Sequence, residues 1–479
     1  MRHATPKLIT VACVAIAGVI LLTGRTTGLS STAQRAVPAS VTAIAPSPTA
    51  KPTPPPVWAA LDLALVAGDD DTVLRLFDEN VEQVEARGRN TFLGLDAVLA
   101  PSRPQLIREV DRLVLADRFD DASTIAGRLA RRFPNDAAAT RRAEAVDVWR
   151  RQGDDAEVWT GTIPHLFIHS LIVRSELAFD GDYQDQGYRD YMITRVEFER
   201  MLDELWRNNF ILIDLHELYS VADDRTVTAR ELPLPPGKRP MVFSIDDVSY
   251  YDYMAGNGFA ERLEIGEAFD VGTVMRLDDG SEQFTLTGDA MPILDQFVLA
   301  HPDFSLGGAK GIIAVTGYEG AFGYDFSRDQ VDDPDYGQRV EAATGIAARL
   351  RELGWDFASH SYTHGDWLKS PQSSFGRFTF DAENWEAEVE PVLGETDIYI
   401  TPFGFDLSDR NARLRYLVEE KGFTAFHPIA PDTPLTYEDD YLRMYRTAVD
   451  GYALRETPHL LEPFFNPAVV WDEKRGQVE

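Results

Sequence analysis

Short, uninterrupted apolar runs alternate with longer amphipathic segments between residues 158 and 472. Uninterrupted apolar runs predict buried strands, whereas apolar positions that recur every three or four residues predict helices. The predicted strands are Ile163–Leu171, Phe210–Leu215, Met241–Ile245, Gly311–Val315, Trp355–Ser359, Asp397–Thr401 and Phe423–Phe426. The predicted helix before Phe210 begins with the capping-box pattern Thr194-x-x-Glu197. Repeated strand–helix units with buried strands are typical of a parallel sheet, and about seven of them predict an α/β fold, a distorted (β/α) barrel.

One segment of this region has a different pattern. Residues 259–290 alternate apolar and polar positions on both sides of Asp279-Gly280, a strong signal for a hairpin turn. The segment follows the loop after the Met241–Ile245 strand. We therefore expect a β-hairpin flap beside a substrate groove, with a hairpin of no functional role as the alternative.

Residues 57–154 have a helical pattern without predicted strands. The stretch Ala116–Asp136 resembles one tetratricopeptide-type helical hairpin, because it has small residues at Ala122 and Ala126 and a closing Pro134. A generic helical bundle is the other interpretation. The region is expected either to bind a protein partner or to form a helical cap on the barrel.

The N-terminus carries a targeting signal. Positive charges precede the apolar run Leu8–Gly24, so residues 1–25 are predicted to be an uncleaved membrane anchor or a cleaved signal peptide. In either case the rest of the chain lies outside the cytoplasm, as a single-pass membrane protein or a secreted one. Residues 26–56 are rich in Ala, Ser, Thr and Pro, which predicts a disordered linker.

Charge and cysteine content narrow the possible partners. The chain has 46 Lys and Arg against 78 Asp and Glu, a formal net charge of −32, which argues against a nucleic-acid partner. Its single cysteine, Cys13, lies inside the apolar N-terminal run. An internal disulfide or a cysteine-based metal site is therefore excluded.

Two adjacent carboxylates, Asp246 and Asp247, end the Met241–Ile245 strand. Neighbouring side chains at a strand end point in different directions, so one acid can bind a metal while the other acts as a base; a loop start or a helix cap is the simpler alternative. His360 and His364 follow another predicted strand. Because functional residues of such barrels collect at the carboxyl ends of strands, we expect one of the two acids and the two histidines to form one divalent metal site.

The same residues match the motifs of a known family. FSIDD at Phe243–Asp247 resembles the first motif of polysaccharide deacetylases, the NodB-homology carbohydrate esterases, which is written TFDDG. SHSYTH at Ser359–His364 resembles their second motif, HSxxH, and TPFG at Thr401–Gly404 resembles the end of their third, RxPYG. The resemblance extends from about residue 163 to residue 426.

The resemblance implies a reaction and a set of roles. Asp246 would be the general base, and Asp247, His360 and His364 would bind one divalent metal ion, commonly zinc in this family. The reaction would be hydrolysis of N-acetyl groups on an amino sugar of a cell-envelope polysaccharide. The residues expected to bind substrate are Pro402, Phe403 and Tyr362.

The chain departs from the family pattern at several positions. Ile400 stands where the third motif begins with arginine, Val248 replaces the last glycine of the first motif, and the terminal LHD is missing. That arginine normally accompanies the base carboxylate, and Arg446 is a candidate replacement. The candidates for the general acid are His169, His427 and His459, of which His169 is preferred because it ends the first predicted strand.

These departures leave alternatives to the deacetylase hypothesis. One is a catalytically degenerate protein that binds an envelope glycan or acts as a scaffold. Another is the same metal chemistry on a different amide or ester.

Overall fold

The computed structural model describes residues 57–370, 373–431 and 435–475. The predicted anchor and linker, residues 1–25 and 26–56, lie outside these ranges. Within them, no helix combines the length and the apolar character needed to cross a membrane.

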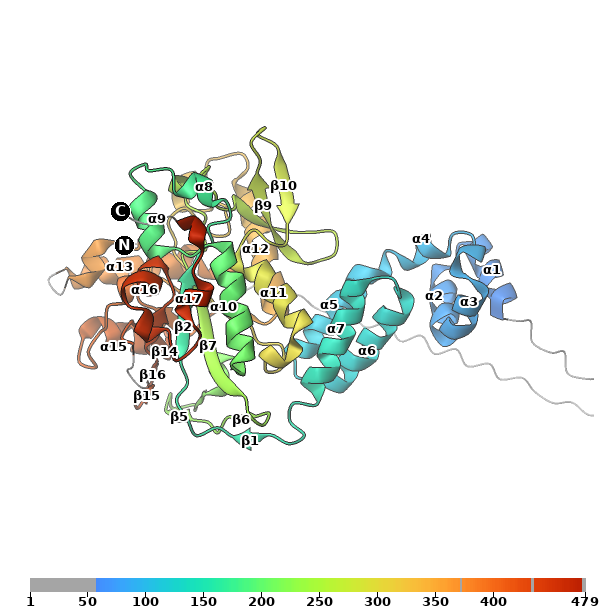
Figure 1. Cartoon of the computed structure of the whole chain (residues 1–479), viewed down its shortest axis with the longest axis horizontal. Coiled ribbons are helices and arrows are strands. Elements are labelled where there is room, and N and C mark those ends of the chain that lie inside the picture. Colours follow the sequence, from blue (N-terminus) through green and yellow to red (C-terminus); the bar gives the residue numbers. More distant parts are fainter. Residues whose placement is uncertain (1–56, 371–372, 432–434, 476–479) are drawn as a thin grey trace, which may run out of the picture. The chain divides into compact units, whose positions relative to one another are not determined.

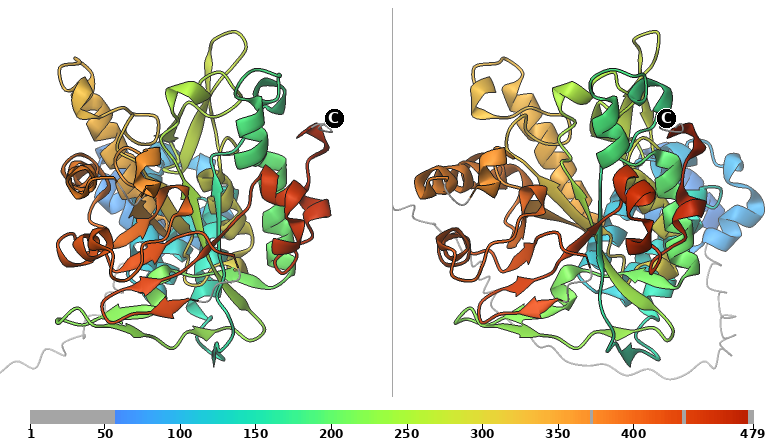
Figure 2. Two further views of the ribbon diagram at one scale, coloured as in Figure 1. Left: turned by 90° about the vertical axis from the view of Figure 1, so that its left-hand side faces the viewer. Right: turned by 60° about the vertical axis from the view of Figure 1, so that its left-hand side comes forward.

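A curled sheet forms the centre of the C-terminal region (Figure 2). Its strands run in the order β15-β16-β14-β13-β12-β11-β7-β2-β17, and β3 pairs with β7 off this path. All of these pairings are parallel except that of β15 with β16. The strands are β2 (His165–His169), β3 (Phe210–Leu212), β7 (Arg239–Asp246), β11 (Gly311–Val315), β12 (Trp355–Ser359), β13 (Ile398–Ile400), β14 (Ala425–His427), β15 (Thr436–Tyr437), β16 (Leu442–Arg443) and β17 (Arg446–Ala448). The predicted α/β class is confirmed, and the sheet path holds nine strands where about seven were expected.

The stretch from β16 to β17 lies beside two strands that are far apart on the sheet path. Its first part pairs with β14, and the N–H of Arg446 donates to the carbonyl of Pro428 over 2.9 Å. Its second part pairs with β2. The side chain of Arg446 is thereby placed among the inward-facing residues of the curled sheet, where it is 1% exposed.

Helices cover the outer face of the sheet (Figure 1). The capping box predicted at Thr194 and Glu197 is present at the start of α10. Phe198 of this helix stacks on Phe243 of β7, with ring centroids 6.1 Å apart. The helices that follow β2 in the chain are α8 (Ser175–Ala178), α9 (Asp185–Tyr191), α10 (Arg195–Arg207), α11 (Ala290–Ala300), α12 (Tyr336–Glu352), α13 (Phe375–Glu388), α14 (Glu390–Leu393), α15 (Ala412–Glu419), α16 (Gly451–Glu456) and α17 (Pro467–Val470).

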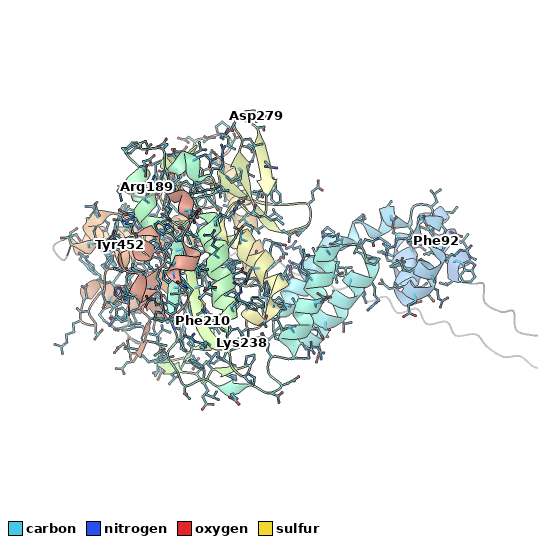
Figure 3. The ribbon with its side chains drawn as sticks, in the orientation of Figure 1. Phe92, Arg189, Phe210, Lys238, Asp279 and Tyr452 are labelled. Atoms are coloured by element: carbon cyan, nitrogen blue, oxygen red, sulfur yellow. The ribbon has the colours of Figure 1, made fainter. Side chains whose placement is uncertain are left out.

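The inserted segment forms a three-stranded antiparallel sheet of β8 (Arg262–Ile265), β9 (Val271–Arg276) and β10 (Glu282–Thr285). The β9–β10 hairpin turns at Asp279 and Gly280, and Asp279 is labelled in Figure 3. Gly280 has a φ of 82°, a conformation that a residue without a side chain adopts easily. β8 is a strand that the alternating pattern did not distinguish. Asp278 beside this turn accepts a hydrogen bond from Arg174, just before α8, over 2.7 Å. Two short ladders lie elsewhere, β1 (Glu157–Val158) with β6 (Pro233–Leu234) and β4 (Tyr219–Val221) with β5 (Val227–Ala229).

Seven helices precede the sheet: α1 (Val57–Ala67), α2 (Asp70–Glu79), α3 (Val81–Arg87), α4 (Leu95–Leu99), α5 (Ser102–Leu115), α6 (Phe119–Arg132) and α7 (Ala137–Arg150). The first four share a small core that includes Phe77 and Phe92, the latter labelled in Figure 3. The stretch Ala116–Asp136 holds one helix, α6, so the prediction of a helical hairpin within it is wrong. Ala122 and Ala126 of α6 are fully buried in the same core as residues of α5 and α7. Their small side chains let α6 approach these two helices closely.

Buried charges join α5 and α7 to α12. The carboxylate of Asp111 in α5 accepts hydrogen bonds from Arg142 of α7 over 2.8 Å and from Arg349 of α12 over 2.5 Å. Both arginine side chains are at most 3% exposed. The indole of Trp149 also donates to the carbonyl of Pro302 over 3.0 Å. The α5–α7 helices therefore form a cap on the sheet region.

Replacement of Asp111 by alanine is expected to destabilise the protein strongly. The substitution leaves the buried guanidinium group of Arg142 without a carboxylate and that of Arg349 with Glu352 alone, and breaking a buried ion pair typically costs about 3–5 kcal/mol. Denaturant unfolding of the two proteins measures the change. The exposed pair of Arg75 with Glu79 provides the control, since Arg75→Ala should cost no more than about 1 kcal/mol. Equal effects of the two substitutions would show that the buried charges around Asp111 do not stabilise the attachment of the cap.

Candidate metal centre

The predicted site residues lie at the carboxyl ends of neighbouring strands. His169 ends β2, Asp246 ends β7 with Asp247 directly after it, and His360 follows the last residue of β12. Within the sheet, β7 lies between β2 and β11, and β11 pairs with β12. The strand order therefore brings both acids and the histidines to one rim.

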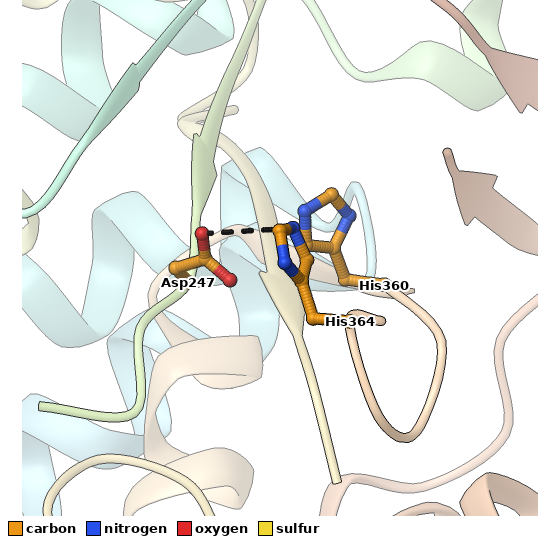
Figure 4. A group of neighbouring side chains, drawn as sticks. All are labelled: Asp247, His360 and His364. Carbon is orange, nitrogen blue, oxygen red and sulfur yellow. Dashed lines mark ion pairs between the residues drawn. The ribbon is translucent and has the colours of Figure 1, made fainter. Parts of the chain in front are cut away.

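Asp247, His360 and His364 converge on one point (Figure 4). Each offers one ligand atom, and these atoms all lie within 4.8 Å of one another. Oδ2 of Asp247 is 4.0 Å from Nε2 of His364, the contact drawn as a dashed line in Figure 4. Two imidazoles and one carboxylate suit zinc at a catalytic site, because they leave a coordination position open.

The backbone around this group is unusual. Asp247, Ser361 and His364 have φ values of 62°, 61° and 43°, in the left-handed region that residues with side chains rarely occupy. The Oγ of Ser361 accepts a hydrogen bond from the N–H of His364 over 3.0 Å, which closes the turn between the two histidines. Such conformations cost of order 1–3 kcal/mol each and concentrate at functional sites.

His360 is oriented by the neighbouring strand. Its Nδ1 lies 2.8 Å from the carbonyl oxygen of Ile400, at the end of β13, so Nδ1 carries the proton and donates. Nε2 is left unprotonated and faces the carboxylates, 3.9 Å from Oδ2 of Asp246. Burial lowers the pKa of His360 to about 4, which keeps the ring neutral, the form that binds metal.

Asp246 is held by Arg446. Nη1 of Arg446 donates to Oδ1 and Oδ2 of Asp246 over 2.7 and 2.9 Å, and both side chains are buried. Burial by itself raises the pKa of Asp246, but the positive charge of Arg446 outweighs it and lowers the pKa to about 2. Arg446, which the sequence offered only as a candidate, therefore pairs with the predicted base where the family motif would have used its own arginine.

The three histidines considered as general acid lie in different surroundings. Nε2 of His169 is 3.9 Å from Oδ2 of Asp247, and its buried Nδ1 has no hydrogen-bond partner among the described residues. His427 is fully buried, and its Nδ1 lies 3.2 Å from Nδ1 of His165. Burial lowers the pKa of His427 to about 3. His459 is exposed in the C-terminal region. Of the three, His169 is the one whose ring reaches a predicted metal ligand.

The predicted substrate-binding residues differ in exposure. Phe403 is 44% exposed, and its ring centroid is 4.3 Å from that of His364. Pro402 is buried next to it. The hydroxyl of Tyr362 donates to Glu388 of α13 over 2.6 Å. A role of these residues in substrate binding stays a prediction.

Two site neighbours were not identified from the sequence. The hydroxyl of Tyr251 donates to Oδ1 of Asp247 over 2.9 Å. Burial raises the pKa of Asp450, and a hydrogen bond from the backbone of Ala453 and the neighbouring His169 partly offset this effect. Asp450 also caps α16 by accepting from the N–H of Ala453 over 2.7 Å. A loop tyrosine and a helix cap carry no sequence signal that links them to a metal site.

No protein-family model and no curated protein matches this chain. The resemblance to polysaccharide deacetylases therefore rests on the motif residues of the sequence and stays a prediction.

A second group of possible ligands lies at the opposite ends of the strands. Ligand atoms of Asp214, His216 and Asp356 are also within 4.8 Å of one another. Both ring nitrogens of His216 face carboxylates, however, with Nδ1 3.0 Å from Asp214 and Nε2 2.9 Å from Asp397. Although burial lowers the pKa of His216, the hydrogen bonds that its ring donates to Asp214, Asp356 and Asp397 raise it far above 6.5. The group is therefore a protonated histidine held by acids.

This arrangement predicts a pH-dependent contribution of His216 to stability. A histidine with a raised pKa stabilises the fold fully below its unfolded value of about 6.5, and the contribution is lost as the pH rises above it. Burial by itself raises the pKa of Asp397, but the hydrogen bond with His216 outweighs this effect and lowers the pKa from 3.8 to about 2. The contribution of Asp397 to stability is therefore lost as the pH falls through that range. The difference in unfolding free energy between wild type and His216→Gln should therefore be greatest between about pH 4 and pH 6.5.

Denaturant unfolding at several pH values measures this difference. A difference that does not change with pH would show that folding leaves the pKa of His216 unchanged, which contradicts its pairing with the three acids.

Proposed function

We propose that the chain is a metal-dependent hydrolase that removes N-acetyl groups from a cell-envelope polysaccharide. The observation that carries the proposal is the convergence of Asp247, His360 and His364 within 4.8 Å, with the separate carboxylate of Asp246 beside His360. The match of these residues to two deacetylase motifs supports it. The proposed scaffold is a distorted (β/α) barrel, since the β16–β17 stretch lies beside both β14 and β2.

Asp247, His360 and His364 would hold one divalent ion, with zinc favoured by the ligand set. When bound, such an ion supplies Lewis acidity towards a water molecule and an amide carbonyl. His360 is prepared for this role because its other ring nitrogen is already bonded to Ile400. Asp247 supplies the negative charge of the ligand set.

Asp246 would accept the proton of the attacking water. Its low pKa keeps it ionised at neutral pH, and Arg446 holds its orientation. His169 would donate a proton to the departing amine, because its ring lies on the same rim, 3.9 Å from Asp247. The products would be acetate and a free amino sugar. Each role follows from the position of a side chain relative to the three ligands.

The substrate and location complete the proposal. Phe403 would contact a sugar ring, because it is exposed and lies against His364, and Pro402 and Tyr362 would shape the same groove. The predicted N-terminal anchor would place the domain outside the cytoplasm, where envelope glycans lie. The exposed apolar side chains of Leu63 and Val66 in α1, and of Leu93 in the turn before α4, are groups that a protein partner of the helical region would cover. The net charge of −32 argues against nucleic acid.

The alternative of a catalytically degenerate glycan-binding protein is based on two absences from the family pattern, the arginine of the third motif and the histidine of the terminal LHD. The pairing of Arg446 with Asp246 weakens it, since the base carboxylate has a guanidinium partner after all. Action on another amide or ester would use the same residues, and only the acyl group released distinguishes it.

Metal content and acetate release test the proposal together. We expect the purified protein to bind one divalent ion and to release acetate from N-acetylglucosamine oligomers. His360→Ala and Asp247→Ala should lose tight metal binding and activity together. Asp246→Asn should keep the metal while kcat falls by about 10²–10⁴-fold, the usual contribution of a general base.

The exposed His459 provides a matched control, since His459→Ala removes a histidine distant in the chain from the motifs. Full metal binding by His360→Ala would contradict the assigned ligands. A metal-loaded protein that binds glycan but releases neither acetate nor another acyl group would favour the scaffold alternative.

A further inference from the structure

The two carboxylate oxygens of Asp247 face different partners. Oδ2 lies 3.9 Å from Nε2 of His169 and 4.0 Å from Nε2 of His364, on the side of the proposed metal. Oδ1 accepts a hydrogen bond from the hydroxyl of Tyr251 over 2.9 Å. Oδ2 of Asp247 therefore faces the histidines of the site, while Oδ1 is engaged by the hydroxyl of Tyr251.

The direction of the hydrogen bonds follows from proton counting. An ionised carboxylate can only accept, so the single hydroxyl proton of Tyr251 goes to Asp247. The hydroxyl of Thr316, 2.8 Å from the Tyr251 oxygen, must then be the donor in that contact. The chain of donors therefore runs from Thr316 to Tyr251 to Asp247, and bonds in such a chain strengthen one another.

The ring of Tyr251 is fixed by other tyrosines. It stacks on Tyr318 with centroids 4.8 Å apart and an interplanar angle of 5°, and on Tyr253 at 5.6 Å and 18°. Tyr253 in turn stacks on Tyr188 of α9 at 6.5 Å and 18°. Tyr251 itself is 2% exposed. Two other segments of the chain, which carry Tyr318 and Tyr188, thus help to hold this loop and its Tyr251 ring in place.

We propose that Tyr251, supported by Thr316, is a positioning residue for the metal centre: it orients the Asp247 carboxylate so that Oδ2 alone is presented to the metal. The proposal rests on the metal-dependent function proposed above. The left-handed backbone of Asp247, with φ of 62°, gives the carboxylate its direction, and the Tyr251 hydroxyl sets its rotation. No other described side chain donates a hydrogen bond to Asp247.

The test is the affinity of the purified protein for Zn²⁺, measured by competition with a chelator of known affinity. Tyr251→Phe keeps the stacked ring and removes only the hydroxyl. Loss of an outer-shell partner of a metal ligand typically weakens binding about 10–100-fold, and we expect a loss in this range. Thr316→Val should give a smaller loss in the same direction.

Controls separate positioning from a general structural effect. Tyr253→Phe removes a hydroxyl from the next ring of the row and should leave the Zn²⁺ affinity unchanged. In the Tyr251→Phe background, Thr316→Val should cause no further loss, because its effect passes through the missing hydroxyl. Thermal unfolding of each metal-free variant confirms that the fold is intact, and Thr316→Val carries the test if Tyr251→Phe fails to fold.

The outcomes also separate this inference from the proposed function. If wild type binds no Zn²⁺ or other divalent ion, the metal-dependent function fails. If wild type binds Zn²⁺ and the folded Tyr251→Phe variant binds it equally tightly, the function stands and the positioning role is overturned. Additive losses in the double variant would likewise overturn the proposed donor chain.

Discussion

The buried pairing of Arg446 with Asp246 determines how the rest of the centre can work. A carboxylate removed from water without a partner takes up a proton, and Asp246 is 3% exposed. The guanidinium group, in two hydrogen bonds of 2.7 and 2.9 Å, keeps this group ionised in an interior that would otherwise neutralise it. The pairing exists only because the curled sheet brings β17 beside β2, which itself pairs with β7. The curvature of the sheet and the protonation state of one side chain are thus linked.

Much of the sheet was predictable because its strands are buried on both faces. Gly311–Val315 and Trp355–Ser359 were expected as strands from their apolar runs, and the structure places them at those residues. The position of His360 and of Asp246 followed from the same rule, since parallel strands end at one rim. Local pattern and one general rule of topology were sufficient for these residues.

Contacts between distant segments were not predictable in the same way. Asp246 and Arg446 are separated by 200 positions, and no spacing rule connects them. The small residues of Ala116–Asp136 indicated close helix packing, but not that the partners of α6 are α5 and α7, so a whole helical hairpin was predicted where the structure has one helix. The left-handed backbone of Asp247 and His364 was equally hidden, because neither residue is a glycine and only the surrounding structure imposes that conformation.

The order of the site residues along the chain has a consequence for biosynthesis. The three proposed metal ligands lie between residues 247 and 364, whereas Arg446 belongs to β17, near the C-terminal end. Chains emerge from the ribosome or a translocation channel with the N-terminal part first. A nascent chain therefore carries the complete ligand set before it carries the counter-charge of Asp246. The proposed ligands are therefore synthesised first, and the proposed base gains its counter-charge only when the last strand of the sheet is added.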